Sequence, residues 1–298
     1  MERLRGVFPM AVTPFAADGS VAAGELPRVV SFVLESGCPG VSALGLGGEA
    51  GALTREERLA VAEAVVAAAA GAPVLIGCSA PETELAVELA VHAAACGAAA
   101  AMVAPPPRPD WTREQLTEHY LRIAQAVAPL PVMVQDAPAF VGVALDPDFV
   151  RELRALAANV SYVKSEAVPV ADTVAALAAL EDVAVFGGHG ALYTLDALDA
   201  GATGMIPGCE LAAEYARIFE LHQAGEREEA RRLFTRVLPL VVAQFQSLDA
   251  FVASTKEVLA ARGVISRADV RAGAGLGALS RRLLLEHAVA AGALPAAP

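Results

Sequence analysis

Short apolar runs alternate with longer amphipathic segments along roughly the first two thirds of the chain. The runs are rich in valine and alanine and cover Val7–Val12, Val41–Leu44, Pro73–Gly77, Ala99–Val103, Pro131–Gln135, Val160–Lys164, Val183–Phe186 and Thr203–Ile206. Between them, apolar positions recur with helical period over Arg55–Ala70, Glu82–Cys96, Arg113–Ala126, Pro147–Leu156, Val168–Leu180 and Ala191–Ala200. Continuously apolar runs of strand length indicate strands that are covered on both faces. The pattern therefore predicts eight strand–helix units.

Eight such units are the number that closes a barrel, whereas a doubly wound sheet more often has five or six strands. Capping residues support the borders: Thr54, Thr112 and Asp146 precede helices, and Gly37, Gly71, Gly97 and Gly201 follow them. We predict an α/β fold, a (β/α)₈ TIM barrel over residues 1–210. Additional C-terminal helices over residues 211–298 are expected to pack on it as one structural unit, near Leu211–Ala224, Glu226–Leu248, Asp249–Arg262 and Leu276–Ala290.

Composition and net charge exclude some classes of binding partner for this chain. The formal net charge of −12 argues against nucleic acid and against an anionic membrane surface. The chain begins without a signal-peptide-like apolar segment and has no long charge-free apolar stretch outside alanine-rich amphipathic helices. Four cysteines lie far apart, without a Cys-x-x-Cys pair, and are interpreted as free buried thiols. These features predict a soluble protein of the reducing cytoplasm.

In a barrel of this kind the chemistry lies where the strands end. Lys164 is the only cation at the predicted strand ends, and it is one of only two lysines among 22 basic residues. Unlike a guanidinium, an amine can lose its proton inside a protein and attack a carbonyl to form a Schiff base. Alternation places Tyr162 and Val160 beneath it on the inner face, where burial favours the neutral amine. The alternative is an ordinary lysine with its ammonium in water.

Two glycine-rich strand ends allow several interpretations. Gly45–Glu49 imitates a dinucleotide fingerprint weakly, and it otherwise fits a backbone nest for a carboxylate or a simple turn. Gly187–Gly190 would cradle a phosphate or make room for a substrate tail. His189 is the only histidine at a strand end, so a metal-dependent aldolase with several histidine ligands finds no support. Acidic residues near the strand ends, Glu49, Asp136 and Glu166, give no clear Mg²⁺ ligand set.

Several of these motifs together resemble the dihydrodipicolinate synthase and N-acetylneuraminate lyase group of Schiff-base aldolases and dehydratases. The resemblance covers nearly the whole chain and rests on Ala11–Phe15, Gly45–Glu49, Ala137-Pro138, Val163-Lys164, Gly187-Gly188 and Gly201–Gly208. It implies a (β/α)₈ barrel with C-terminal helices, usually a homotetramer built as a dimer of dimers. It also implies that Lys164 forms the imine with a 2-oxo acid such as pyruvate.

The chain departs from this family at four positions. Gln135 stands where the family has a proton-shuttling tyrosine, and an amide cannot act as an acid or a base. Leu46 and Gly47 replace a pair of hydroxyl residues. Phe140 stands where true synthases carry an arginine, and Pro107 stands at a second relay tyrosine. Relatives without the tyrosine usually act on sugar-derived 2-oxo acids or aromatic aldol products, and Phe140, Pro106 and Pro107 predict an apolar entrance.

We therefore expect a metal-independent lyase, an aldolase or a dehydratase, without metal or organic cofactor. Lys164, Gln135 and Glu166 are the expected catalytic residues, and the expected substrate-binding residues are Gly47, Gly48, Glu49, Gly188, His189 and Ile206. Proton transfer is open among Glu166, Ser165, His189, Glu49 and a water held by Gln135. An authentic 4-hydroxy-tetrahydrodipicolinate synthase, a non-catalytic 2-oxo-acid-binding barrel and a phosphosugar enzyme remain as alternatives.

Overall fold

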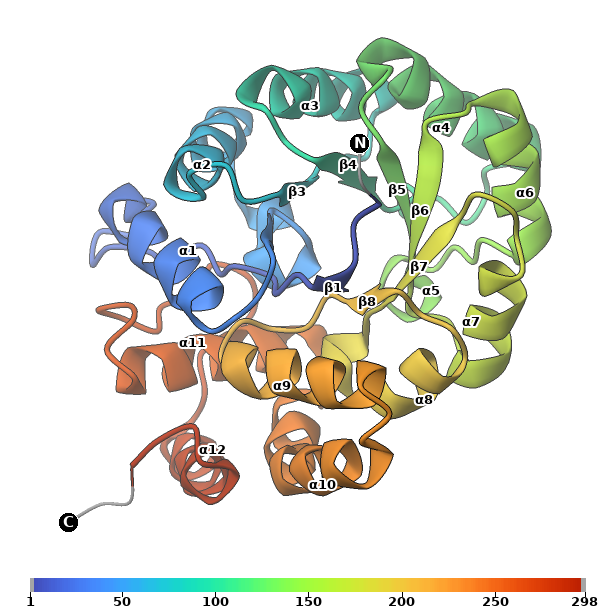
Figure 1. Cartoon of the computed structure of the whole chain (residues 1–298). Helices are drawn as coiled ribbons and strands as arrows, with labels where there is room; N and C mark the ends of the chain where they lie inside the picture. The colour runs from blue at the N-terminus through green and yellow to red at the C-terminus, as the bar shows by residue number, and fades with distance from the viewer. Residues whose placement is uncertain (1–2, 296–298) are drawn as a thin grey trace.

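A computed structural model describes residues 3–295 and has eight parallel strands in one barrel, as the sequence predicts (Figure 1). The strands are β1 Gly6–Val7, β2 Val41–Ala43, β3 Val74–Gly77, β4 Ala100–Val103, β5 Val132–Asp136, β6 Val160–Ser165, β7 Ala184–Gly187 and β8 Gly204–Met205. Hydrogen bonds join them in the order β1-β8-β7-β6-β5-β4-β3-β2. The segment after β1 closes the ring, because the Ala11 N–H donates to the Ser42 carbonyl at 2.7 Å.

Helices form a ring outside the strands (Figure 1). They include α1 Leu26–Glu35, α2 Arg55–Ala68, α3 Thr83–Cys96, α4 Arg113–Val127, α6 Pro147–Leu156, α7 Val170–Ala178 and α8 Thr194–Asp199, whereas the short α5 Pro138–Val141 lies inside this ring. Thr54 and Thr112 each form a capping box, and the Asp146 side chain accepts from the Phe149 N–H, so these caps are confirmed. The sequence patterns did not delimit α1 or the short α5.

Two apolar cores lie on opposite faces of the sheet. The larger one fills the space between the strands and the helices. The smaller one fills the inside of the barrel with Phe8, Met10, Leu75, Ala100, Met102, Met133, Tyr162, Ala184, Phe186 and Ile206. Because residues alternate between these cores, Tyr162 and then Lys164 point inward along β6. Lys164 therefore stands above a packed apolar layer.

A bulge in β6 overturns one detail of the expected inner face. Val132 of β5 pairs with Val160, but the next residue, Met133, pairs with Tyr162, so Ser161 is extra. The extra residue reverses the alternation below Tyr162 and turns Val160 to the core under the helices. The prediction that Val160 shares the inner face with Lys164 is wrong for this reason.

The C-terminal segment forms four helices, of which the first, after β8, completes the ring of helices and the other three pack beside it (Figure 1). These are α9 Ala212–Gln223, α10 Arg227–Gln244, α11 Leu248–Ala261 and α12 Ala278–Ala291. Helix α10 packs between α9 and α12, and α11 packs on the short turn Leu46–Gly48 that follows β2. The last helices thereby reach the end of the barrel at which the strands terminate. Within residues 3–295, no helix combines the length and the apolar character needed to cross a membrane.

Candidate active site at the carboxyl ends of the strands

Lys164 lies near the end of β6 and is only 5% exposed. In the sheet it stands between Gln135 of β5 and Phe186 of β7, with which it is in register. Below it lies the apolar layer of the barrel interior. The structure thus buries the amine as the sequence predicts and removes it from bulk water.

Glu166 follows the end of β6 and turns back toward the lysine. Its Oε1 lies 3.4 Å from Lys164 Nζ, and both side chains are almost fully buried. The Gln135 amide donates to Oε2 at 2.7 Å, while the His189 N–H donates to Oε1 at 3.0 Å. Gly188 makes room for this arrangement, because a Cβ at that position would lie 2.3 Å from Glu166 Cγ. These four expected site residues therefore surround the amine or its partner carboxylate.

The environment of Glu166 favours its ionised form. Burial alone would raise the pKa of Glu166, because desolvation penalises the charge. The charge of Lys164 and the hydrogen bonds that the carboxylate accepts together outweigh this penalty. The pKa of Glu166 is therefore lowered. The ionised carboxylate is therefore the counter-charge of Lys164 in the resting site.

Asp136 is the second buried carboxyl group at this end of the sheet. Its Oδ1 accepts a hydrogen bond from the Leu145 N–H at 3.0 Å. Burial raises the pKa of Asp136 to about 6, and the negative charge of Glu166 adds to the rise. Its side chain supports the loop after β5, and it does not line the cavity at Lys164.

A narrow cavity opens beside Lys164. Its walls are Met10, Leu46, Gly47, Phe140, Lys164, Glu166, Gly190, Ile206, Pro207, Phe245, Leu248 and Phe251. Its volume of about 20 Å³ is room for about one water molecule. A 2-oxo acid is larger than one water, so side chains of the wall must move to admit it. Ile206 and Phe140 line the cavity as expected, whereas Pro106 and Pro107 do not.

Aromatic rings cover this cavity. Phe245 is the centre of the group, with ring centroids 5.9 Å from Phe140, 5.4 Å from Phe251 and 6.0 Å from His189. Phe245 ends α10 and Phe251 lies in α11, so the C-terminal helices supply part of the wall. The sequence patterns missed this contribution. The available signal was two phenylalanines close to a helix break in a chain with only 5% aromatic residues.

Gly47 is the part of the glycine-rich turn that faces the cavity. A Cβ at Gly47 would lie 3.1 Å from the Phe251 ring, so the close packing of α11 favours glycine. The Gly48 N–H donates within the turn to the Gly45 carbonyl at 3.0 Å. Gly48 therefore supports the turn, and Gly47 remains the better placed backbone donor for a carboxylate.

Glu49 has contacts different from those expected of a substrate ligand. Its side chain forms a fully buried ion pair with Lys256 of α11. Its Oε2 also accepts from the Arg271 N–H at 2.7 Å and the Ala272 N–H at 2.9 Å. Glu49 does not line the cavity at Lys164, and its carboxylate instead joins the turn after β2 to α11. The second lysine of the chain thus holds this carboxylate in place.

Two backbone N–H groups of the turn after β7 already donate hydrogen bonds within the protein. Gly188 N–H donates to the Ser165 carbonyl at 3.1 Å, and the His189 N–H is used by Glu166. A phosphate at this turn would meet the Glu166 carboxylate, so the arrangement argues against a phosphate cradle. Burial lowers the pKa of His189, whose ring packs against Tyr193 with centroids 5.4 Å apart.

Ser165 is a less favoured candidate for proton transfer. It is buried, and its hydroxyl has no hydrogen-bond partner among residues 3–295. It does not line the cavity. Of the candidates for proton transfer, Glu166 has the titratable atom in direct contact with the amine.

The parallel barrel thus brings a buried lysine and a buried carboxylate together at the carboxyl ends of its strands, where barrel enzymes have their active sites. The chain matches the dihydrodipicolinate synthetase family over residues 3–290. It belongs to that family, a family of lyases.

Individual relatives agree with this assignment. The chain is 30% identical over 271 residues to the L-2-keto-3-deoxyarabonate dehydratase of Azospirillum brasilense, covering 89% of this chain and 86% of the relative. It is 34% identical over 246 residues to a 4-hydroxy-tetrahydrodipicolinate synthase of Methanothrix thermoacetophila, covering 81% and 82%. The crystal structure of dihydrodipicolinate synthase from Rhodopseudomonas palustris superposes with a TM-score of 0.90 at 29% identity, covering 96% and 97%.

Proposed function

We propose that this protein is a Schiff-base lyase in which Lys164 forms an imine with a 2-oxo acid. The observation that carries the proposal is the buried Lys164 amine 3.4 Å from the Glu166 carboxylate. A lysine must be neutral to attack a carbonyl carbon, and an adjacent base can remove its proton. Metal and organic cofactors have no part in the proposed reaction.

The reaction begins with transfer of a proton from the Lys164 ammonium to Glu166. The free amine then attacks C2 of the 2-oxo acid, and a proton moves from the attacking nitrogen to the carbonyl oxygen, which becomes a hydroxyl. Protonation of that hydroxyl by Glu166 lets it leave as water, which gives an iminium ion. The iminium accepts the electron pair when Glu166 removes a C3 proton or when the C3–C4 bond breaks, and an enamine results. In the cleavage, the C4 hydroxyl gives its proton to Glu166 and C4 leaves as an aldehyde.

The enamine can then react in two ways. A hydroxyl at C4 can leave, which is a dehydration, or the enamine can add to an aldehyde, which is an aldol condensation. The 30% identity to a dehydratase of a sugar-derived 2-oxo acid supports the first, and the similarity to synthases supports the second. The Gly47 N–H would hold the carboxylate of the 2-oxo acid, and Gln135 would hold Glu166 in position.

The residues of the cavity wall favour a substrate that is uncharged at the end remote from its 2-oxo acid group. Phe140, Phe245 and Phe251 face the space beside Lys164, and among the described residues of this wall Lys164 is the only cation. A second carboxylate, as in aspartate semialdehyde, would have no basic partner there. We therefore favour sugar-derived or aromatic 2-oxo acids over the substrates of an authentic 4-hydroxy-tetrahydrodipicolinate synthase.

The proposal is tested by borohydride reduction in the presence of pyruvate, followed by intact-mass measurement and peptide mapping. We expect wild type to gain one reduced pyruvate adduct on Lys164, and Lys164→Arg to gain none while folding normally. Lys256, the only other lysine, is the internal control, because peptide mapping should find no adduct on it in wild type. Absence of an adduct with every member of a panel of 2-oxo acids would sink the Schiff-base proposal.

Turnover measured on the same panel of 2-oxo acids distinguishes catalysis from binding alone. An adduct on Lys164 without turnover of any 2-oxo acid would indicate the non-catalytic barrel. Turnover that is lost in EDTA while circular dichroism shows the chain still folded, and that Mg²⁺ or Zn²⁺ restores, would move the protein to the metal-dependent class. We also propose a cytoplasmic location, which the four free cysteines support. The proposed assembly is a homotetramer. Light scattering on the purified chain tests the tetramer.

A further inference from the structure

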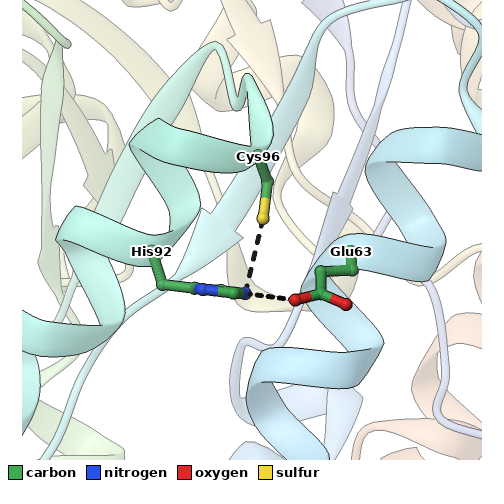
Figure 2. Close-up of side chains that lie close together, drawn as sticks. All are labelled: Glu63, His92 and Cys96. Carbon is green, nitrogen blue, oxygen red and sulfur yellow. Dashed lines mark hydrogen bonds and ion pairs between the residues drawn. The ribbon is translucent and has the colours of Figure 1, made fainter.

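A cluster of three potential metal ligands lies on the outer helices, apart from the barrel interior that holds Lys164. Figure 2 shows Glu63 of α2 facing His92 and Cys96 of α3. His92 and Cys96 are four residues apart, so they lie one turn apart on the same face of α3. The cluster therefore joins a carboxylate, an imidazole and a thiol across the gap between two neighbouring helices.

The distances within this cluster suit a common metal ion. His92 Nε2 lies 3.3 Å from Glu63 Oε1 and 3.4 Å from Cys96 Sγ, and the three ligand atoms all lie within 4.8 Å of one another. Zn²⁺ binds nitrogen and oxygen at about 2.0–2.2 Å and sulfur at about 2.3 Å in tetrahedral geometry, which separates neighbouring ligand atoms by roughly 3.3–3.6 Å. The two separations at His92 are close to these values before any metal is added.

The hydrogen bonding of His92 points the same way. Its Nε2 faces the Leu59 carbonyl oxygen at 3.2 Å as well as the Glu63 carboxylate and the Cys96 sulfur. One ring nitrogen carries at most one proton, so a single N–H is shared among three electron-rich atoms. A dication among these groups interacts favourably with the carboxylate and with the sulfur in its thiolate form. The ring nitrogen then serves as a ligand with its proton moved to Nδ1.

Ligand type and exposure decide which ion fits. A thiolate and an imidazole favour Zn²⁺ and related transition metals over Mg²⁺ and Ca²⁺, which prefer oxygen ligands. The His92 side chain is 24% exposed and that of Glu63 is 63% exposed, so solvent can reach the cluster and water can complete the coordination. The expectation from sequence that all four cysteines are buried fails at Cys96, which is only partly covered.

We propose that Glu63, His92 and Cys96 bind one Zn²⁺ ion on the surface between α2 and α3. Binding forms Zn–O, Zn–N and Zn–S bonds and releases the Cys96 thiol proton to the solvent, with no change of oxidation state. The ion links α2 to α3 and stabilises the folded barrel. This site is distinct from the Schiff-base chemistry, which proceeds without metal.

The test uses the full-length, untagged, metal-free protein and Co²⁺ and Zn²⁺ as probes. Wild type should bind one Co²⁺ with a thiolate-to-metal charge-transfer absorption, which one equivalent of Zn²⁺ removes. Cys96→Ser should lose that absorption, and Cys96→Ser and His92→Gln should each bind Zn²⁺ at least about tenfold more weakly, since loss of even an outer-sphere partner costs that much. Zn²⁺ should raise the Tm of wild type more than that of either variant.

The control variant is His287→Gln on α12, which removes a histidine far along the chain from the cluster and should bind like wild type. Circular dichroism of each metal-free variant establishes that it is folded before the titration. Zn²⁺ affinity unchanged in Cys96→Ser and His92→Gln would overturn the proposal, as would failure of folded wild type to bind Co²⁺. The borohydride adduct on Lys164 should form equally with and without Zn²⁺, so failure of one proposal leaves the other intact.

Discussion

Gln135 is the residue at which this site differs most from the expected family pattern, which has a tyrosine there. An amide cannot transfer a proton, but at 2.7 Å it donates to Glu166 and fixes that carboxylate beside Lys164. The residue that replaces the tyrosine therefore acts on the group we assign to proton transfer. Gln135 is a positioning residue in this scheme, and Glu166 is the acid and base.

Replacement of Gln135 by alanine tests this division of roles. Gln135→Ala removes one hydrogen bond to a charged group, which is worth about 1–3 kcal/mol of transition-state stabilisation. We expect kcat/KM to fall about tenfold to a hundredfold, while the borohydride adduct still forms. Steady-state kinetics on the best 2-oxo acid of the panel measures the effect, and Gln246→Ala, at an exposed glutamine, is the control.

A stronger result would come from Gln135→Tyr. If this single change produced condensation of pyruvate with aspartate semialdehyde, the tyrosine would be the only missing part of a synthase and the lyase assignment would be wrong. We expect no such activity, because Phe140 leaves the second carboxylate without a basic partner.

At the scale of elements, the buried pair of Glu49 and Lys256 joins the turn after β2 to α11. The ammonium also donates to the Asp269 carbonyl at 2.8 Å and lies 4.1 Å from the centre of the Phe15 ring. Desolvation lowers the pKa of Lys256, and the Glu49 carboxylate opposes that change. A charge buried this completely is tolerated only with its partner present.

Removal of one member of this pair should therefore cost more than removal of both. We expect Lys256→Met to lower the free energy of unfolding by about 3–5 kcal/mol, because Glu49 is left buried without its counter-charge. The double variant Glu49→Gln with Lys256→Met should recover much of the loss. Denaturant unfolding curves measure both. Arg232→Met, which removes an exposed pair with Glu229, should have little effect, and an equal loss in that variant would refute the argument.

The elements themselves were largely predictable from sequence, and particular exceptions show where prediction ends. Helix α6 begins at Pro147 and ends at Leu156 as expected, because an aspartate cap and helical periodicity are local signals. The bulge at Ser161 was not predictable, because a run of apolar residues carries no mark of an extra residue. Lys164 was found from its rarity and its strand end. Phe245 and Phe251 were missed, because only tertiary packing brings α10 and α11 over the barrel.

At the scale of the whole molecule, Glu210 lies where the barrel meets the C-terminal helices. Glu210 follows β8, and the polar side chains of Gln244 of α10 and Thr255 of α11 act to lower the pKa of its carboxyl group. It is completely buried, and neither of its carboxylate oxygens has a close hydrogen-bond partner among residues 3–295. Burial raises the pKa of Glu210 from an ordinary value near 4.5 to about 7.

This shift makes the stability of the chain depend on pH. Between about pH 4.5 and pH 7 the folded state holds a proton that the unfolded state has lost, so stability decreases as pH rises through this window. The favourable contribution is complete below the unfolded pKa and lost above the folded one. The shift corresponds to about 3 kcal/mol.

Glu210→Gln should remove this dependence. We expect the variant to gain up to about 3 kcal/mol over wild type at alkaline pH and to gain little at about pH 5. Urea unfolding of both proteins at the two pH values provides the measurement. Glu181→Gln, at an exposed turn, is the control and should follow wild type at each pH. A Glu210→Gln curve parallel to that of wild type would show that Glu210 is not the source.

The contribution of α10 and α11 to the cavity wall has a consequence for how this enzyme can diversify. The reacting amine stands on a strand of the barrel, while Phe245, Leu248 and Phe251 are encoded in a separate, later stretch of the gene. Exchange of that stretch between relatives would alter which molecules are admitted and leave Lys164 and Glu166 unchanged. New substrate preferences can thus arise here by recombination within this later segment, without rebuilding the strands.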